Sequence, residues 1–161
     1  MDMSRQIKNI IAITVFLICI SLINVAGQNI EIEIRGMNAF TFILIIAVLL
    51  QVIFFIPSFL LKTEKYFDIV GSLTYIITIS IAYFSVENKT MIDSIIYFYV
   101  MVWAARLGIY LFRRVRNDGK DIRFEKAKRH FFWFLQYWMG QALWVSLTAC
   151  AAIIAILSPE D

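Results

Sequence analysis

Five apolar runs alternate with short polar segments along the chain. They cover residues 7–27, 38–61, 67–85, 91–112 and 131–157. The runs are continuously apolar, without the alternation of a membrane β-barrel, and they reach the roughly 18 to 20 residues needed to cross a bilayer core of about 30 Å. Because an isolated segment in lipid satisfies its backbone hydrogen bonds only as a helix, the pattern predicts five transmembrane helices. The short connections favour one antiparallel bundle, so we assign residues 1–161 to a single all-α integral membrane domain.

Composition agrees with this assignment, and the placement of charge adds an orientation. Hydrophobic residues make up 61% of the chain and charged residues 17%, which leaves too little polar surface for a water-exposed domain. Two basic residues, Arg5 and Lys8, lie at the start of the first run, two separate the second from the third, and eight lie in the loop 113–130. The opposite side carries only Arg35 and Lys89. The positive-inside rule therefore predicts a cytoplasmic N-terminus and a cytoplasmic basic loop. Attraction to anionic headgroups explains this loop better than nucleic-acid binding, so no nucleic-acid partner is expected.

The first run has a competing interpretation. Basic residues before it and the small residues Val25-Ala26-Gly27 after it resemble a secretory signal with a cleavage site. Its apolar part is longer than the usual 7 to 15 residues of such signals, so we interpret it as a spanning helix. Cys19 and Cys150 both lie inside apolar runs, where they predict neither a disulfide framework nor a metal site.

Polar positions inside the runs are the first candidates for function. Residues 28–35 alternate isoleucine with polar or acidic residues, which predicts a short strand or an interfacial loop. Gln51 lies near the middle of the second run, and either turns a polar face into a pocket or ties two helices by one hydrogen bond. Asp68, Ser72 and Tyr75 share one face of the third predicted helix. Asp68 interacts there either with the helix N-terminus or with a cation of the fourth helix, for which we favour Arg106.

Arg106 is the least expected residue of the fourth run. It lies seven residues before Arg113, on the order of 10 Å inside the boundary of the apolar run. Helical spacing places it on one face with Tyr99, Trp103, Tyr110 and Arg113. Aromatic rings and two guanidinium groups suit an anionic or phosphate-bearing ligand. They equally suit a snorkelling arginine in an ordinary interfacial belt.

Four ordered blocks between residues 62 and 145 resemble the steroid 5-alpha-reductase-like membrane proteins, and more narrowly their branch of unknown-function membrane domains. The blocks are 62–75 (KTEKYFDIVGSLTY), 103–114 (WAARLGIYLFRR), 119–124 (GKDIRF) and 141–145 (QALWV). The resemblance implies a polytopic helix bundle that reduces a carbon–carbon double bond of a sterol or enone lipid with NADPH. It implies cofactor binding by Arg106, Arg113, Asp121 and Arg123, and a substrate pocket bordered by Asp68, Tyr75, Tyr110 and Gln141. Within the last block, Gln141 and Trp144 are expected to face the bundle.

The chain departs from that pattern after Trp144. Family members continue through a Ser-Arg-His-Pro-Asn-Tyr-like segment and further helices that hold much of the NADPH, and no such segment follows here. We therefore expect the front half of a reductase, with membrane lipid around it and a second chain supplying the missing helices. The alternative is a non-catalytic, shortened membrane protein or assembly subunit, and the enzyme assignment stays open between them. The expected location is the inner or plasma membrane in a bacterium, or the endoplasmic reticulum in a eukaryote.

Overall fold

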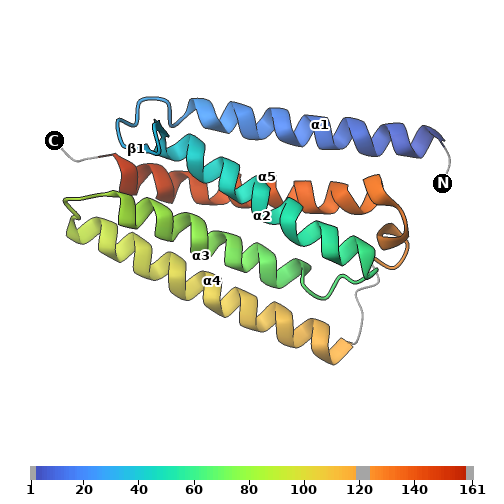
Figure 1. Ribbon diagram of the computed structural model, residues 1–161. Helices are drawn as coiled ribbons and strands as arrows, with labels where there is room; N and C mark the ends of the chain where they lie inside the picture. The colour runs from blue at the N-terminus through green and yellow to red at the C-terminus, as the bar shows by residue number, and fades with distance from the viewer. Residues whose placement is uncertain (1–2, 119–123, 159–161) are drawn as a thin grey trace.

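The computed structural model describes residues 3–118 and 124–158, except for the side chains of residues 115–118. Within these ranges the long helices are α1 (Met3–Val25), α2 (Ala39–Leu60), α3 (Phe67–Ser85), α4 (Met91–Asp118) and α5 (Phe131–Leu157), with the short 3-10 helix η2 (Ala127–Arg129) before α5. They lie side by side along one direction (Figure 1). All five long helices are long and apolar enough to cross a membrane, which confirms the predicted all-α, multi-pass bundle.

α1 and α4 form opposite edges of the bundle, with α2, α3 and α5 between them (Figure 1). α5 packs against α1, α2 and α3, whereas α4 packs chiefly against α3. One end of the bundle holds the start of α1, the α2–α3 connection and η2 (Figure 1). We call it the basic end, because Lys62, Lys65, Arg113, Lys126 and Arg129 lie there. The other end holds a small hairpin and the α3–α4 turn.

The helix boundaries follow the apolar runs closely, with two clear differences, at the start of α1 and at the end of α4. α3 and α5 begin and end where the sequence predicts, whereas α1 begins at Met3, earlier than expected. α4 continues to Asp118, so the loop expected over 113–130 is helical in its first part. Hydropathy ends this run at Phe112, but arginine is a good helix former and the chain meets no helix-breaking residue before Gly119. The last turns of α4, which carry the basic residues, thus extend beyond the apolar part of this helix.

The alternating segment after α1 forms the expected short strand. β1 (Glu33–Ile34) pairs antiparallel with β2 (Met37–Asn38). The two turn residues Arg35 and Gly36 have φ angles of 55° and 75°, the positive values that a two-residue type I′ hairpin requires. Asn38 then caps α2, since its side chain accepts a hydrogen bond from the Thr41 backbone N–H at 3.1 Å.

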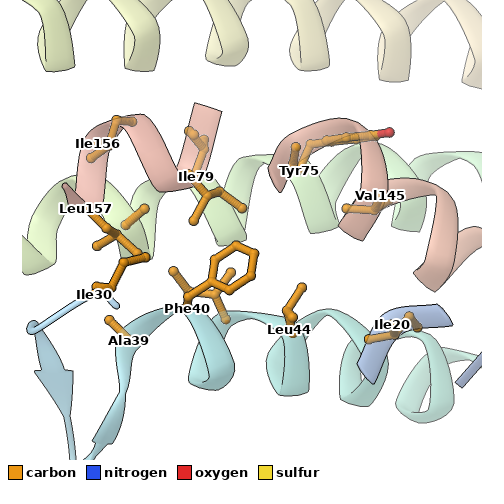
Figure 2. Packing of buried hydrophobic residues seen from close by; sticks show 14 of the residues in the cluster. Ile20, Ile30, Ala39, Phe40, Leu44, Tyr75, Ile79, Val145, Ile156 and Leu157 are labelled. Atoms are coloured by element: carbon orange, nitrogen blue, oxygen red, sulfur yellow. The ribbon is translucent and has the colours of Figure 1, made fainter. Parts of the chain in front are cut away.

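Two apolar clusters fill the bundle. The first lies towards the hairpin end, where Phe40 and Leu44 of α2 meet Ile79 of α3 and Ile156 of α5 (Figure 2). The second lies towards the basic end and is largely aromatic. It contains Phe55, Val70, Phe124, Ala127, Phe134, Trp138 and Met139. Many large apolar side chains of α1 and α4 stay exposed, as expected for helices that contact lipid.

Candidate functional site

Polar side chains gather on α3 and connect it to three neighbouring helices. We call Asp68, Ser72, Thr74 and Tyr75 the polar seam. The Ser72 hydroxyl donates to the Ala104 carbonyl of α4. Thr74 is bonded to α2, Tyr75 to α5 and Asp68 to α4. Since polar groups are rare and costly inside a membrane bundle, this concentration on one helix makes α3 the candidate centre of the site.

The α2 contact of the seam is a fully buried hydrogen bond. Gln51 has no exposed surface, and its Nε2 donates to Thr74 Oγ1 at 2.9 Å. Thr74 Oγ1 itself donates to the Val70 carbonyl at 2.7 Å. The structure thus contains the interhelical hydrogen bond that the sequence allows. Gln51 Oε1 is buried without a hydrogen-bond partner among the described residues.

The α5 contacts of the seam depend on a glycine. Gln141 Nε2 donates to the Phe67 carbonyl at 3.0 Å, and a Cβ added at Gly71 would overlap the Gln141 amide. Gln141 therefore faces the bundle, as predicted, because α3 has no side chain at this point. The matching prediction for Trp144 is wrong. This residue is 64% exposed, because it lies on a side of α5 that the neighbouring helices leave uncovered.

Tyr75 lies about two turns after Phe67 along α3. Its hydroxyl is 2.5 Å from Thr148 Oγ1 of α5, and its ring meets Trp103 of α4 edge to face, with the ring centroids 4.9 Å apart. Thr148 Oγ1 also donates to the Trp144 carbonyl at 2.7 Å. The tyrosine thus places a hydroxyl between α3 and α5 and a ring against α4. Only 4% of the residue is exposed.

Asp68 pairs with a cation of α4, as expected, but with Arg114 and not with Arg106. The Arg114 Nη2 to Asp68 Oδ2 distance is 3.2 Å. Asp68 stands in the first turn of α3, and the antiparallel packing sets this turn beside the last apolar turn of α4. Arg106 lies two turns deeper and is exposed, without a hydrogen bond or ion pair to any described residue.

The aromatic and cationic face predicted for α4 exists, and it is the outer face of that helix. Tyr99, Trp103 and Tyr110 are 68%, 46% and 64% exposed, and Arg106 and Arg113 are exposed beside them. Because α4 is an edge helix, other helices leave much of this face uncovered, while Trp103 still contacts Tyr75 of α3. We call these five residues the outer α4 face.

A shallow groove runs between α3 and α4 beside the outer α4 face. Its volume is about 310 Å³, and its walls are almost wholly apolar. Ser72 and Gly108 form its floor, where a Cβ added at Gly108 would overlap the serine side chain. Glycine therefore lets the two helices approach closely here. Arg113 closes the groove at the basic end.

The structure brings together some of the residues predicted for function. Of the predicted substrate residues, Asp68, Tyr75 and Gln141 all serve contacts of α3, whereas Tyr110 lies on the outer α4 face. Of the predicted cofactor residues, Arg106 and Arg113 share the outer α4 face, and Asp121 and Arg123 lie outside the described residues. Within the described ranges no group of three potential metal ligands occurs.

Two contacts were not foreseen from the sequence. Glu64, in the α2–α3 connection, is buried and binds Lys128 Nζ of η2 at 2.7 Å. Ser72 meets α4 at Gly108, where an added Cβ would overlap the serine side chain. The sequence offered one signal for close helix contacts, the glycines Gly71 and Gly108, because small residues mark places where membrane helices approach closely.

Comparison with known proteins identifies a family for most of these elements. The family described as "Protein of unknown function (DUF1295)" matches residues 54–161. This segment contains α3, α4 and α5, and hence the polar seam, the groove and the outer α4 face. Neither a curated protein nor a solved structure matches the chain. Since the match covers well over half of its residues, the chain belongs to DUF1295, a family of membrane proteins of unknown function.

Proposed function

We propose that this chain forms the membrane part of an NADPH-dependent reductase that acts on a carbon–carbon double bond of an enone lipid. The observation that carries the proposal is the polar seam: four polar residues within eight positions of one membrane helix. Polar residues inside a membrane bundle are costly and frequently functional, and here they also join neighbouring helices. The blocks that resemble the steroid-reductase-like proteins, residues 62–145, fall inside the segment matched by the family.

On the substrate side, the proposal assigns the proton-donating role to Tyr75. Reduction of an enone adds a hydride at one carbon and a proton elsewhere, and a hydroxyl bonded to the carbonyl oxygen stabilises the charge that develops there. Tyr75 is buried between α3, α4 and α5 with its hydroxyl on Thr148. Asp68 and Gln141 hold the first turns of α3 against its neighbours, so in this proposal they position Tyr75.

On the cofactor side, the proposal uses the basic end. NADPH carries several phosphate charges and would supply the hydride when bound. Arg113 fits its phosphates, because this side chain is exposed at the end of α4. Arg106 is deeper and on the outer face, so it would reach the cofactor only from the lipid side. Asp121 and Arg123 complete the proposed set, and we propose that the basic end faces the cytoplasm, as the excess of Lys and Arg favours.

The first test is NADPH binding by the protein extracted from its source membrane, with any co-purifying chain retained. We expect Arg113→Gln to weaken NADPH binding about tenfold, the loss of one charge-assisted contact. Arg35→Gln, which removes a charge at the hairpin end, is the matched control and should bind normally. If the native protein does not bind NADPH, the reductase proposal fails, and the non-catalytic membrane protein or assembly subunit becomes the better assignment.

The second test separates chemistry from binding. Tyr75→Phe should leave NADPH affinity unchanged while lowering the enone-dependent oxidation of NADPH by about 100-fold, a typical contribution of a positioned proton donor. The phenyl ring keeps the packing against Trp103, so the fold should survive. Equal turnover by the variant and the native protein would remove Tyr75 from the reaction.

A further inference from the structure

Arg106 is an intramembrane charge whose counter-charge the described chain does not supply. It lies seven residues before Arg113, about 10 Å deeper along α4. Side chains on a helix lean towards its N-terminus, and α4 begins at the hairpin end, so Arg106 leans away from the water at the basic end. A guanidinium in such a place is costly unless it meets an anion or a strong acceptor. The anion or acceptor that Arg106 needs therefore has to come from outside the described residues.

The surroundings of Arg106 define the shape and polarity of such a ligand. Arg113 lies two turns along the same stripe of α4 and closes the groove between α3 and α4. From Arg113 the groove runs towards the bundle centre between apolar side chains of the two helices. These are Ile69, Leu73 and Ile76 of α3 and Ala105, Ile109 and Phe112 of α4. A ligand with an anionic head and a hydrocarbon tail matches both parts.

A second copy of the chain matches this surface poorly. In a symmetric dimer formed through α4, Arg106 of one copy would lie close to Arg106 of the other copy. Like charges repel strongly in lipid. Acidic residues within the described membrane-spanning segments are Asp68 and Asp93. Asp68 is engaged by Arg114, and Asp93 accepts a hydrogen bond from the Thr90 backbone N–H at 2.8 Å. A copy therefore offers no ready partner for Arg106.

We propose that this surface binds one anionic phospholipid, with its phosphate at Arg113, its ester carbonyls towards Arg106 and one acyl chain along the α3–α4 groove. The charge of the two arginines matches the phosphate, and guanidinium groups bind phosphate in a bidentate geometry. Tyr110, exposed one turn before Arg113, lies beside the head as interfacial aromatics do. The lipid would thereby cover the one intramembrane cation of α4. The reductase proposal assigns the same two arginines to NADPH, so lipid and cofactor are alternative occupants of this surface, and lipid binding itself needs no NADPH.

Native mass spectrometry of the full chain in detergent tests the proposal, with phosphatidylglycerol as the anionic probe and phosphatidylcholine as the zwitterionic one. We expect the double variant Arg106→Gln, Arg113→Gln to bind phosphatidylglycerol at least tenfold more weakly and phosphatidylcholine unchanged. The control variant Arg35→Gln, Lys89→Gln removes two charges at the opposite end and should bind as the native chain does. Ala105→Phe keeps both arginines but fills the groove, and should also lose at least tenfold.

Four results would overturn the proposal. They are unchanged phosphatidylglycerol binding in the arginine variant, an equal loss in the control variant, displacement of the lipid by NADPH, and a co-purifying protein that shields Arg106. Displacement by NADPH would assign both arginines to the cofactor, and shielding would assign the surface to a protein partner. Failure of the native chain to bind NADPH would refute only the reductase, because lipid binding is measured without the cofactor.

Discussion

Replacing Gly71 with alanine sets two physical effects of opposite sign against each other. At an unconstrained helix position the change stabilises by about 0.5–1 kcal/mol, because alanine loses less backbone freedom on folding. Here the new Cβ would overlap the Gln141 amide, which donates to the Phe67 carbonyl at 3.0 Å. Overpacking a dense interior costs about 1–3 kcal/mol, and losing an intramembrane hydrogen bond adds about 0.6 kcal/mol. The balance predicts that Gly71→Ala destabilises the bundle by about 1–3 kcal/mol.

The measurement is a double-mutant cycle in reversible unfolding, monitored in mixed micelles. Gln141→Ala removes the obstructing amide, so in that background Gly71→Ala should become neutral or stabilising, with a coupling of at least about 1 kcal/mol. Gly140→Ala is the control, since its added Cβ would lie 3.3 Å from the edge of the Phe16 ring and needs only a slight shift. If Gly71→Ala alone stabilised the protein, or if the cycle gave no coupling, the close contact of α3 and α5 would be refuted.

Two further substitutions test other buried polar contacts by the same unfolding measurement. Gln51→Leu should change the free energy of unfolding by less than about 1 kcal/mol. The substitution removes one hydrogen bond together with the unpaired Oε1, and Thr74 keeps its bond to Val70. A loss above about 2 kcal/mol would reveal a partner for Oε1. Glu64→Gln should destabilise by about 2 kcal/mol, below the 3–5 kcal/mol of a fully buried pair, because the Lys128 side chain is 20% exposed. Adding Lys128→Met to Glu64→Gln should restore most of that loss. If Glu64→Gln alone left stability unchanged, the buried ion pair would not contribute as argued.

The helices were predictable because lipid leaves the backbone few alternatives. A run of about twenty apolar residues has to form a helix, so the boundaries of α3 and α5 followed from hydropathy alone. The same argument failed for α4 beyond Phe112, where the helix continues past the end of its apolar run to Asp118. There the backbone no longer depends on hydropathy, and helix propensity decides how far the helix runs.

The contacts of the site were less predictable, since they depend on how far neighbouring helices slide past each other. The sequence indicated that Asp68 could meet a cation of α4, but the choice between Arg106 and Arg114 depends on the register of α3 against α4. A shift of two turns separates these partners, and no local pattern encodes it. Trp144 shows the same limit in rotation, because its exposure depends on which side of α5 faces α3.

The hydrogen bonds of the polar seam also indicate which of its residues can change partner most readily. Releasing Gln141 from the Phe67 carbonyl, or Gln51 from Thr74, would leave a buried amide group unpaired inside the bundle. Releasing Tyr75 costs less on the protein side, because Thr148 Oγ1 already donates to the Trp144 carbonyl and needs nothing from the tyrosine. With the ring held against Trp103 only the hydroxyl proton can rotate, so in the proposed reaction a substrate carbonyl oxygen would have to approach this hydroxyl where it stands. Compared with the Gln51 and Gln141 amides, the Tyr75 hydroxyl is the group that the proposed substrate would engage at the lower cost.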